Sequence, residues 1–153
     1  MTPYFAYGSN MSRTDMARRC ATAAAIGPAR LEGWRFIVTG DGYASIVPAP
    51  GAVVHGVLWR VSARDLAALN AYENLDSGLY VRRILPVRIV ERIVAAMVYI
   101  GRDRRPGQPR PGYQRVLVAA AREWGLPEAY VRSLERWGQK FGGSRGAEVG
   151  EVG

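Results

Sequence analysis

Two neighbouring runs rich in β-branched residues, 79–90 and 92–101, constrain the fold of this chain more than any other feature. The first is "LYVRRILPVRIV" and the second is "RIVAAMVYIG", and they meet near Glu91 and Arg92. Valine and isoleucine fit the pleated surface of a strand, and two such runs joined closely predict an antiparallel hairpin. The chain is therefore expected to contain a β-sheet.

Shorter candidate strands precede this hairpin and are separated by glycine and proline. One segment, "VVHGVLWRV", alternates in polarity as a half-buried strand does, with Gly56 either a bulge or a point of close approach. The candidate strands cover residues 3–7, 29–39, 44–48 and 53–61.

Helix-start signals lie between the strands. Ser12 is followed three residues later by Asp15, and Ser62 is followed by Asp65, which is the spacing of a capping box. The second signal opens a predicted helix over residues 63–73, in which Leu66, Leu69 and Tyr72 fall on one face.

Two further helices are predicted near the end of the chain. They lie in "GYQRVLVAAAREWG" and in "PEAYVRSLERWG", the second with Pro127 near its first turn. Clustered short strands followed by helices predict one α+β domain, residues 1–141, built on a small mixed sheet or barrel. The tail 142–153 has no apolar periodicity and is expected to be disordered.

The composition excludes several classes of protein. The 153 residues are 48% apolar and 22% charged, as in a soluble globular domain. No apolar run approaches a membrane span, and the N-terminus lacks the features of a signal peptide, so a cytoplasmic location is expected. Cys20 is the only cysteine and His55 the only histidine, which predicts neither a disulfide nor a metal site.

The net charge of +8 raises the alternative of a nucleic-acid binder. All but one of the 21 basic residues are arginine, which indicates a compositional bias, and the densest cluster is loop 102–110. That loop is rich in proline and glycine and has no interleaved aromatic residues, so a solvated loop is favoured over a nucleic-acid surface.

The carboxylate of Glu73 is the main candidate for acid–base chemistry. It ends the helix 63–73 and opens the polar turn "ENLDSGLY". Partial desolvation there would raise its pKa toward neutrality, as a general base requires. The alternative is a surface glutamate, although a carboxylate is disfavoured at the negative end of a helix dipole.

The segment "YFAYGSNM" contains a second candidate. Gly8 permits close approach of a ligand to the backbone, and successive N–H groups of Gly8, Ser9 and Asn10 before a helix form a site for an anion. An ordinary strand-to-helix turn is the alternative.

Other reactive residues have simpler interpretations. His55 is predicted to be a packed or edge histidine, and Cys20 a buried thiol. Tyr80, Tyr99 and Tyr113 are either walls of a pocket or core residues with satisfied hydroxyl groups.

Taken together, "YFAYGSNM" and the later "LNAYENLDSGLYVRR" resemble the γ-glutamylcyclotransferase family. The resemblance runs from Tyr4 to about Trp137 and includes "MVYI", the Gly-Tyr of "RPGYQRVL" and "GLPEAY". It implies a small β-barrel with surrounding helices. It also implies an enzyme in which the α-amine of a γ-glutamyl substrate attacks its own γ-carbonyl, giving 5-oxoproline and a free amine without a cofactor.

The resemblance assigns roles to individual residues. It implies that Glu73 is the catalytic carboxylate and that the backbone of Tyr7, Gly8, Ser9 and Asn10 binds the γ-glutamyl group. It implies pocket positions for three tyrosines, Tyr80, Tyr99 and Tyr113.

Some properties stay open at this level. The mammalian form has glycine after the catalytic glutamate, where this chain has Asn74, which leaves the identity of the leaving group open. A catalytically inactive binding relative is the alternative to an enzyme, and the oligomeric state is either monomer or homodimer. No nucleic-acid or membrane partner is expected.

Overall fold

The computed structural model describes residues 1–73 and 78–142, with side chains described as far as Trp137. Within that part of the chain, five strands close into a barrel with the order β1-β3-β2-β4-β5. They are β1 (Thr2–Ala6), β2 (Ala24–Val38), β3 (Ala44–Val61), β4 (Tyr80–Ile89) and β5 (Arg92–Gly101).

Strand β1 gives the barrel its mixed character. It pairs antiparallel with β3 and parallel with β5, where Tyr4 lies opposite Met97. All other pairs between the described strands are antiparallel. The predicted hairpin of β4 and β5 is present, with Ile89 opposite Arg92 across its turn. The α+β class and the small mixed barrel are therefore confirmed.

The prediction of separate strands at 44–48 and 53–61 is wrong. These residues form one long strand, β3, that stays paired with β2 on both sides of the proline-containing segment. The irregularity is a shift of register: Glu32 lies opposite Val53, whereas Trp34 lies opposite Pro48. Proline and glycine therefore mark an irregularity inside one strand, because pairing with the long partner carries the strand across it.

Gly56 lies in β3 next to the end of its paired neighbour β1, where Ala6 is opposite Val57. A Cβ atom there would be 2.3 Å from the carbonyl oxygen of Ala6 and 2.9 Å from Cζ of Phe5. The register shifts of β2 and β3 occur elsewhere, so the glycine serves close approach and not a bulge. The absence of a side chain at Gly56 therefore lets the end of β1, directly before the glycine-containing turn, pack closely against β3.

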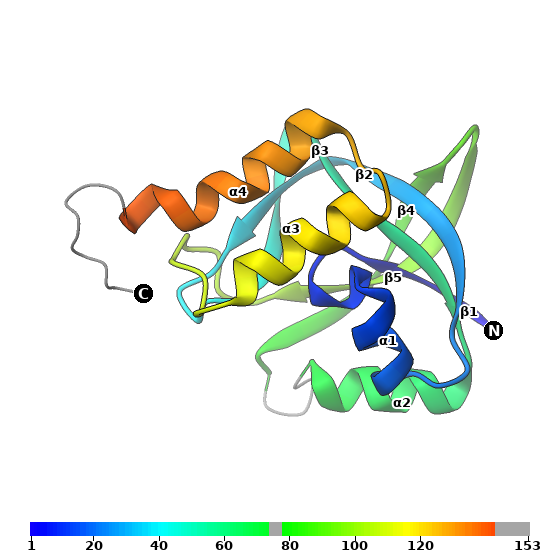
Figure 1. The fold of residues 1–153 in the computed structure, drawn as a ribbon. Coiled ribbons are helices and arrows are strands. Elements are labelled where there is room, and N and C mark those ends of the chain that lie inside the picture. Colours follow the sequence, from blue (N-terminus) through cyan, green and yellow to red (C-terminus); the bar gives the residue numbers. More distant parts are fainter. Residues whose placement is uncertain (74–77, 143–153) are drawn as a thin grey trace.

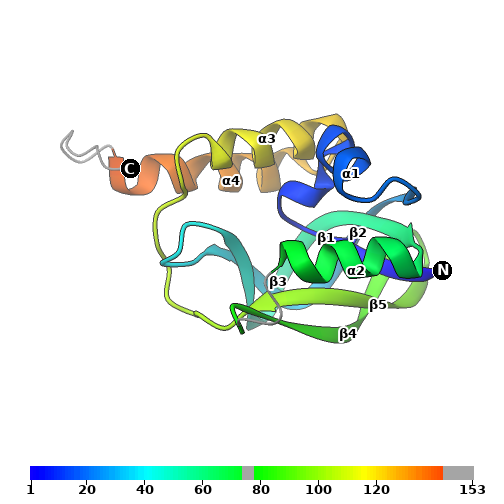
Figure 2. The ribbon, with the colours of Figure 1, turned by 90° about the horizontal axis from the view of Figure 1, so that it is seen from below.

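The helices are arranged around the barrel as Figures 1 and 2 show, with α3 and α4 side by side in both views. Ser62 and Asp65 form the predicted capping box of α2, and Ser12 caps α1 by accepting from the N–H of Asp15. The helices are η1 (Ser9–Met11), α1 (Arg13–Arg19), α2 (Ala63–Tyr72), α3 (Tyr113–Glu123) and α4 (Glu128–Gly142). All four predicted α-helices are confirmed.

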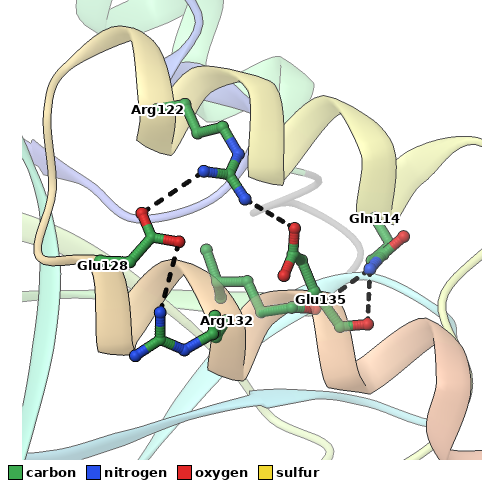
Figure 3. A network of polar contacts seen from close by, with 6 residues as sticks. Gln114, Arg122, Glu128, Arg132 and Glu135 are labelled. Carbon is green, nitrogen blue, oxygen red and sulfur yellow. Dashed lines mark hydrogen bonds and ion pairs between the residues drawn. The ribbon is translucent and has the colours of Figure 1, made fainter.

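Polar contacts join the exposed edges of α3 and α4 (Figure 3). Arg122 reaches Glu128 at 3.4 Å and Glu135 at 2.7 Å, and Gln114 donates to the carbonyl oxygens of Leu134 and Glu135. Exposed pairs of this kind contribute little to stability. The buried side chains of the two helices belong to the hydrophobic core of the domain, namely Leu117, Ala120, Ala121, Val131 and Leu134.

Two predictions from the sequence fall on residues that the structure does not describe. The expected tail lies outside the described residues from 143 onward, and Asn74 also lies outside them. Of the helices that are described, none is long and apolar enough to cross a membrane.

Candidate active site

A small cavity of about 130 Å³ lies at the end of β1, between the turn 8–10 and the end of α2. Its walls come from β1, α2, β4, β5 and α3, which are distant in sequence. The structure brings all eight predicted site residues to this one cavity: Tyr7, Gly8, Ser9, Asn10, Glu73, Tyr80, Tyr99 and Tyr113.

The turn on one side of the cavity is a short 3₁₀ helix, η1. Its first internal backbone bond runs from the N–H of Met11 to the carbonyl oxygen of Gly8 at 3.0 Å, so the N–H groups of Ser9 and Asn10 precede the hydrogen-bonded part of the turn. The indole of Trp124, which caps the C-terminus of α3, donates to the carbonyl oxygen of Met11 at 2.7 Å. The turn is therefore held from outside by α3.

Glu73 caps the C-terminus of α2, and its backbone N–H donates to the carbonyl oxygen of Leu69 at 2.9 Å. Its side chain is partly buried and lines the cavity, which favours a partly desolvated carboxylate over a simple surface glutamate. Burial raises the pKa of the Glu73 carboxyl from 4.5 to about 7, against an opposing effect of the positive charge of Arg19. A carboxyl with this pKa exchanges protons readily at neutral pH.

The pocket tyrosines are fixed by hydrogen bonds to the barrel. Tyr7 donates to the carbonyl oxygen of Tyr99 at 2.6 Å, and Tyr80 donates to that of Ala44 at 2.6 Å. The Tyr113 hydroxyl accepts from the N–H of Ala44 at 3.1 Å. Burial raises the pKa of all four of these tyrosines, so they are neutral at pH 7. The Tyr99 hydroxyl donates to the side-chain oxygen of Asn70 at 2.6 Å. Both sequence interpretations are therefore compatible with the structure, because Tyr80 and Tyr99 are buried, Tyr113 is partly buried, and all three have bonded hydroxyls and line the cavity.

Sequence reasoning missed several residues of the cavity. Tyr4 accepts from the side-chain amide of Asn10 at 2.9 Å, and Tyr43 packs edge-on against Tyr113 at a centroid distance of 5.4 Å. The helical pattern predicts Tyr72 on the apolar face of its helix, but it is 42% exposed and lines the cavity. Its position directly before Glu73 is the one signal in the sequence that points to it.

His55 and Cys20 lie outside the cavity lining, as expected of packing residues. The ring of His55 packs edge-on against Tyr130 at 4.8 Å, and burial lowers its pKa. Cys20 is buried, and burial raises the pKa of its thiol to about 11, so it is unreactive at neutral pH. No group of three potential metal ligands occurs within residues 1–73 and 78–142.

The arginine-rich loop packs partly against the turn between β2 and β3. Arg110 donates from Nε to the carbonyl oxygen of Asp41 at 2.9 Å, and its guanidinium lies 4.7 Å from the ring centroid of Tyr43. Arg102, Arg104 and Arg105 are exposed, which agrees with the interpretation of a solvated loop.

A larger hollow of about 570 Å³ lies between the barrel and α4. Its described lining contains no carboxylate or histidine, so it offers no general base of the kind that Glu73 provides. The lining residues are Arg35, Phe36, Val53, Tyr130, Ser133, Arg136 and Trp137. The smaller cavity is therefore the candidate active site.

Fold and site together define a small mixed-barrel protein that holds a carboxylate opposite a glycine-containing turn in a tyrosine-walled cavity. Comparison with models of known protein families identifies the family to which a protein of this class belongs. The family model described as "Gamma-glutamyl cyclotransferase, AIG2-like" matches residues 4–124, and the chain belongs to that family. The resemblance seen in the sequence is thus confirmed.

Curated relatives and solved structures agree with this assignment. The chain is 30% identical over 142 residues to a gamma-glutamylcyclotransferase of Bos taurus, covering 86% of this chain and 76% of the relative. It is 28% identical over 145 residues to the Homo sapiens protein of the same name, with the same coverage. A solved structure titled "Gamma-glutamyl cyclotransferase" matches with a TM-score of 0.82 at 28% identity, covering 88% of this chain and 86% of the other.

Proposed function

We propose that this chain is a cyclotransferase that converts γ-glutamyl amino acids or amines to 5-oxoproline. The α-amine nitrogen of the substrate attacks its γ-carbonyl carbon, a ring C–N bond forms, and the bond to the leaving amine breaks. Nucleophile and electrophile share one molecule, so positioning supplies much of the acceleration, with effective molarities of roughly 10⁵ M or more. The observation that carries the proposal is the partly buried Glu73, which lines the same cavity as the turn 8–10.

Glu73 acts as the general base and then as the general acid. The α-ammonium group of the substrate is protonated at neutral pH, and a carboxyl with a pKa of about 7 accepts its proton far more readily than one at 4.5. After attack the ring nitrogen gives up a second proton, and the carboxyl passes protons on to the departing nitrogen. The attacking nitrogen thus loses two protons and the leaving amine gains two, so protons balance over the cycle, and no metal or covalent intermediate is required.

The turn and the tyrosines hold the γ-glutamyl group. Backbone N–H groups at Gly8, Ser9 and Asn10 bind a negatively charged oxygen of the substrate, either its α-carboxylate or the oxyanion of the tetrahedral intermediate. Tyr7, Tyr80, Tyr99 and Tyr113 form neutral walls around it, because their pKa values are raised by burial.

The volume of the cavity indicates how much of the substrate it can enclose. At about 130 Å³ it is small beside the roughly 300–1,000 Å³ of pockets that enclose drug-sized ligands. It therefore suits the γ-glutamyl portion of the substrate and leaves the leaving amine outside. The leaving group is then recognised at the rim of the cavity or not at all.

The direct test is incubation with a panel of γ-glutamyl amino acids, γ-glutamyl-lysine isopeptide and simple γ-glutamyl amines. We expect 5-oxoproline, detected by mass spectrometry, together with an equal amount of the free amine. Hydrolysis to glutamate would contradict ring closure, and absence of any product across the panel would contradict the proposed function.

Gly8→Val is expected to weaken substrate binding more than folding. A Cβ atom at Gly8 would lie 3.2 Å from the Tyr113 hydroxyl and 3.3 Å from Cβ of Ala44, so a branched side chain must displace the cavity wall. We expect the loss of folding free energy to lie at the low end of the roughly 1–3 kcal/mol that overpacking costs, and KM to rise more than tenfold, which corresponds to more than about 1.4 kcal/mol.

Steady-state kinetics and thermal unfolding measure the two effects of this substitution. Gly8→Ala is the graded control, because it adds the Cβ atom without the branch, and it should give an intermediate KM. A valine variant with wild-type KM would exclude the turn from the binding site.

A further inference from the structure

Arg19, the last residue of α1, contacts two separate segments at the candidate site. Its Nη1 atom donates to the Ser9 hydroxyl at 3.3 Å and to the side-chain oxygen of Asn10. Its guanidinium carbon also lies 3.9 Å from the ring centroid of Tyr72. One planar cation therefore contacts both the turn after β1 and the end of α2.

The residues that Arg19 contacts are themselves hydrogen-bonded to one another or to other residues of the cavity wall. The amide of Asn10 donates to the Tyr4 hydroxyl at 2.9 Å, and the Ser9 hydroxyl lies 3.2 Å from that of Tyr72. Tyr4, Ser9, Asn10 and Tyr72 all line the cavity, whereas Arg19 does not. Arg19 thus acts on the cavity through the groups that form it.

The charges around Glu73 give Arg19 a second role. Five tyrosines interact electrostatically with Glu73, and burial raises the pKa of each, so all are neutral at pH 7: Tyr4, Tyr7, Tyr80, Tyr99 and Tyr113. Within the described residues, Arg19 is the group that lowers the pKa of Glu73 against the effect of burial. Without a nearby cation, a desolvated carboxyl would remain protonated to higher pH.

We propose that Arg19 is a positioning residue of this site: a single guanidinium holds the Ser9–Asn10 turn against the end of α2 and supplies the positive charge that acts on Glu73. Its catalytic consequence rests on the proposed function. Its electrostatic and structural consequences do not, because both are properties of the unliganded protein.

The test is a direct titration of Glu73 by carbon NMR in protein labelled at the glutamate side-chain carboxyl, with the Glu73 signal assigned from Glu73→Gln. Arg19→Gln removes the charge, and Arg19→Lys keeps the charge but loses the planar fork. Arg18→Gln is the matched control, because Arg18 is the adjacent residue of α1, is exposed and pairs with Asp15 at 2.6 Å. Thermal unfolding is recorded for every variant.

We expect the pKa of Glu73 to rise by about one unit in Arg19→Gln, and to stay near the wild-type value in Arg19→Lys and Arg18→Gln. In a plot of kcat/KM against pH, the acidic limb should move to higher pH in Arg19→Gln. Arg19→Lys should keep that limb and raise KM, because an ammonium group cannot both donate to Ser9 and Asn10 and lay a planar cation over the Tyr72 ring.

An unchanged Glu73 pKa in folded Arg19→Gln would overturn the proposal, since Arg19 would then be merely structural. Should that variant not fold, Arg19→Met replaces it, because methionine keeps an apolar side chain over Tyr72 without the charge. Loss of folding in both neutral variants, with Arg19→Lys folded, would also overturn the proposal. A shifted Glu73 titration in a protein that makes no 5-oxoproline would support Arg19 while rejecting the proposed function.

Discussion

Glu73→Gln is expected to leave a folded protein that forms 5-oxoproline roughly 10²–10⁴-fold more slowly than the wild type. Glutamine nearly keeps the shape of the side chain, but it cannot accept a proton from the α-ammonium group at neutral pH. Because the carboxyl has a pKa of about 7 at the cavity wall, its proton transfer is what the substitution removes. The measurement is kcat/KM on the best substrate of the panel.

Stability gives an independent signature of the same change. The folded-state pKa of Glu73 is raised from 4.5 to about 7, so ionising it costs folding free energy as pH rises through that window. Glutamine removes this cost. We expect Glu73→Gln to be more stable than the wild type at pH 8, by on the order of 1 kcal/mol after allowing for solvent screening, and to show almost no gain at pH 4.

Glu91→Gln is the matched control, because Glu91 is exposed in the turn between β4 and β5. It should change neither turnover nor the pH dependence of stability. Near-normal turnover in Glu73→Gln would show that another group is the base. Lost turnover with lost stability would instead identify Glu73 as a structural residue.

Gly56→Ala is expected to cause the largest loss of stability. The new Cβ atom would lie 2.3 Å from the carbonyl oxygen of Ala6, and backbone cannot move aside as a flexible side chain does. We expect a cost of about 3 kcal/mol, which lowers the melting temperature by about 6–12 °C in a domain of this size. Because β1 leads directly into the turn 8–10, the folded fraction should also have a raised KM.

Gly51→Ala separates the steric cause from the conformational one. Gly51 lies in the same strand, and a Cβ atom added there would meet no other atom within 4 Å, but the residue has a φ of +84°. Alanine there should cost only about 1 kcal/mol of backbone strain. Equal melting temperatures for the two variants would show that close packing against β1 is not the reason for Gly56.

Local patterns predicted most secondary-structure elements because their causes are local. The capping box of Ser62 and Asp65 is a contact within one helical turn, and the β4–β5 hairpin follows from two adjacent runs of strand-forming residues. The prediction of a break inside β3 was wrong because its cause is not local. Proline and glycine interrupt a strand locally, but pairing with β2 continues on both sides of them.

The sequence by itself determined the elements, the position of Glu73 at a helix end and the strand-to-helix turn at Gly8. Only the tertiary structure decided that these features face one cavity, because the closure of β1 against β5 brings together walls that are distant in sequence. It also decided the contributions of Arg19 and Tyr72, which no motif marks. Arg19 matters through the two segments that its guanidinium joins, and the pKa of Glu73 depends on burial and on that charge. Such contacts exist only once the barrel and its helices have packed.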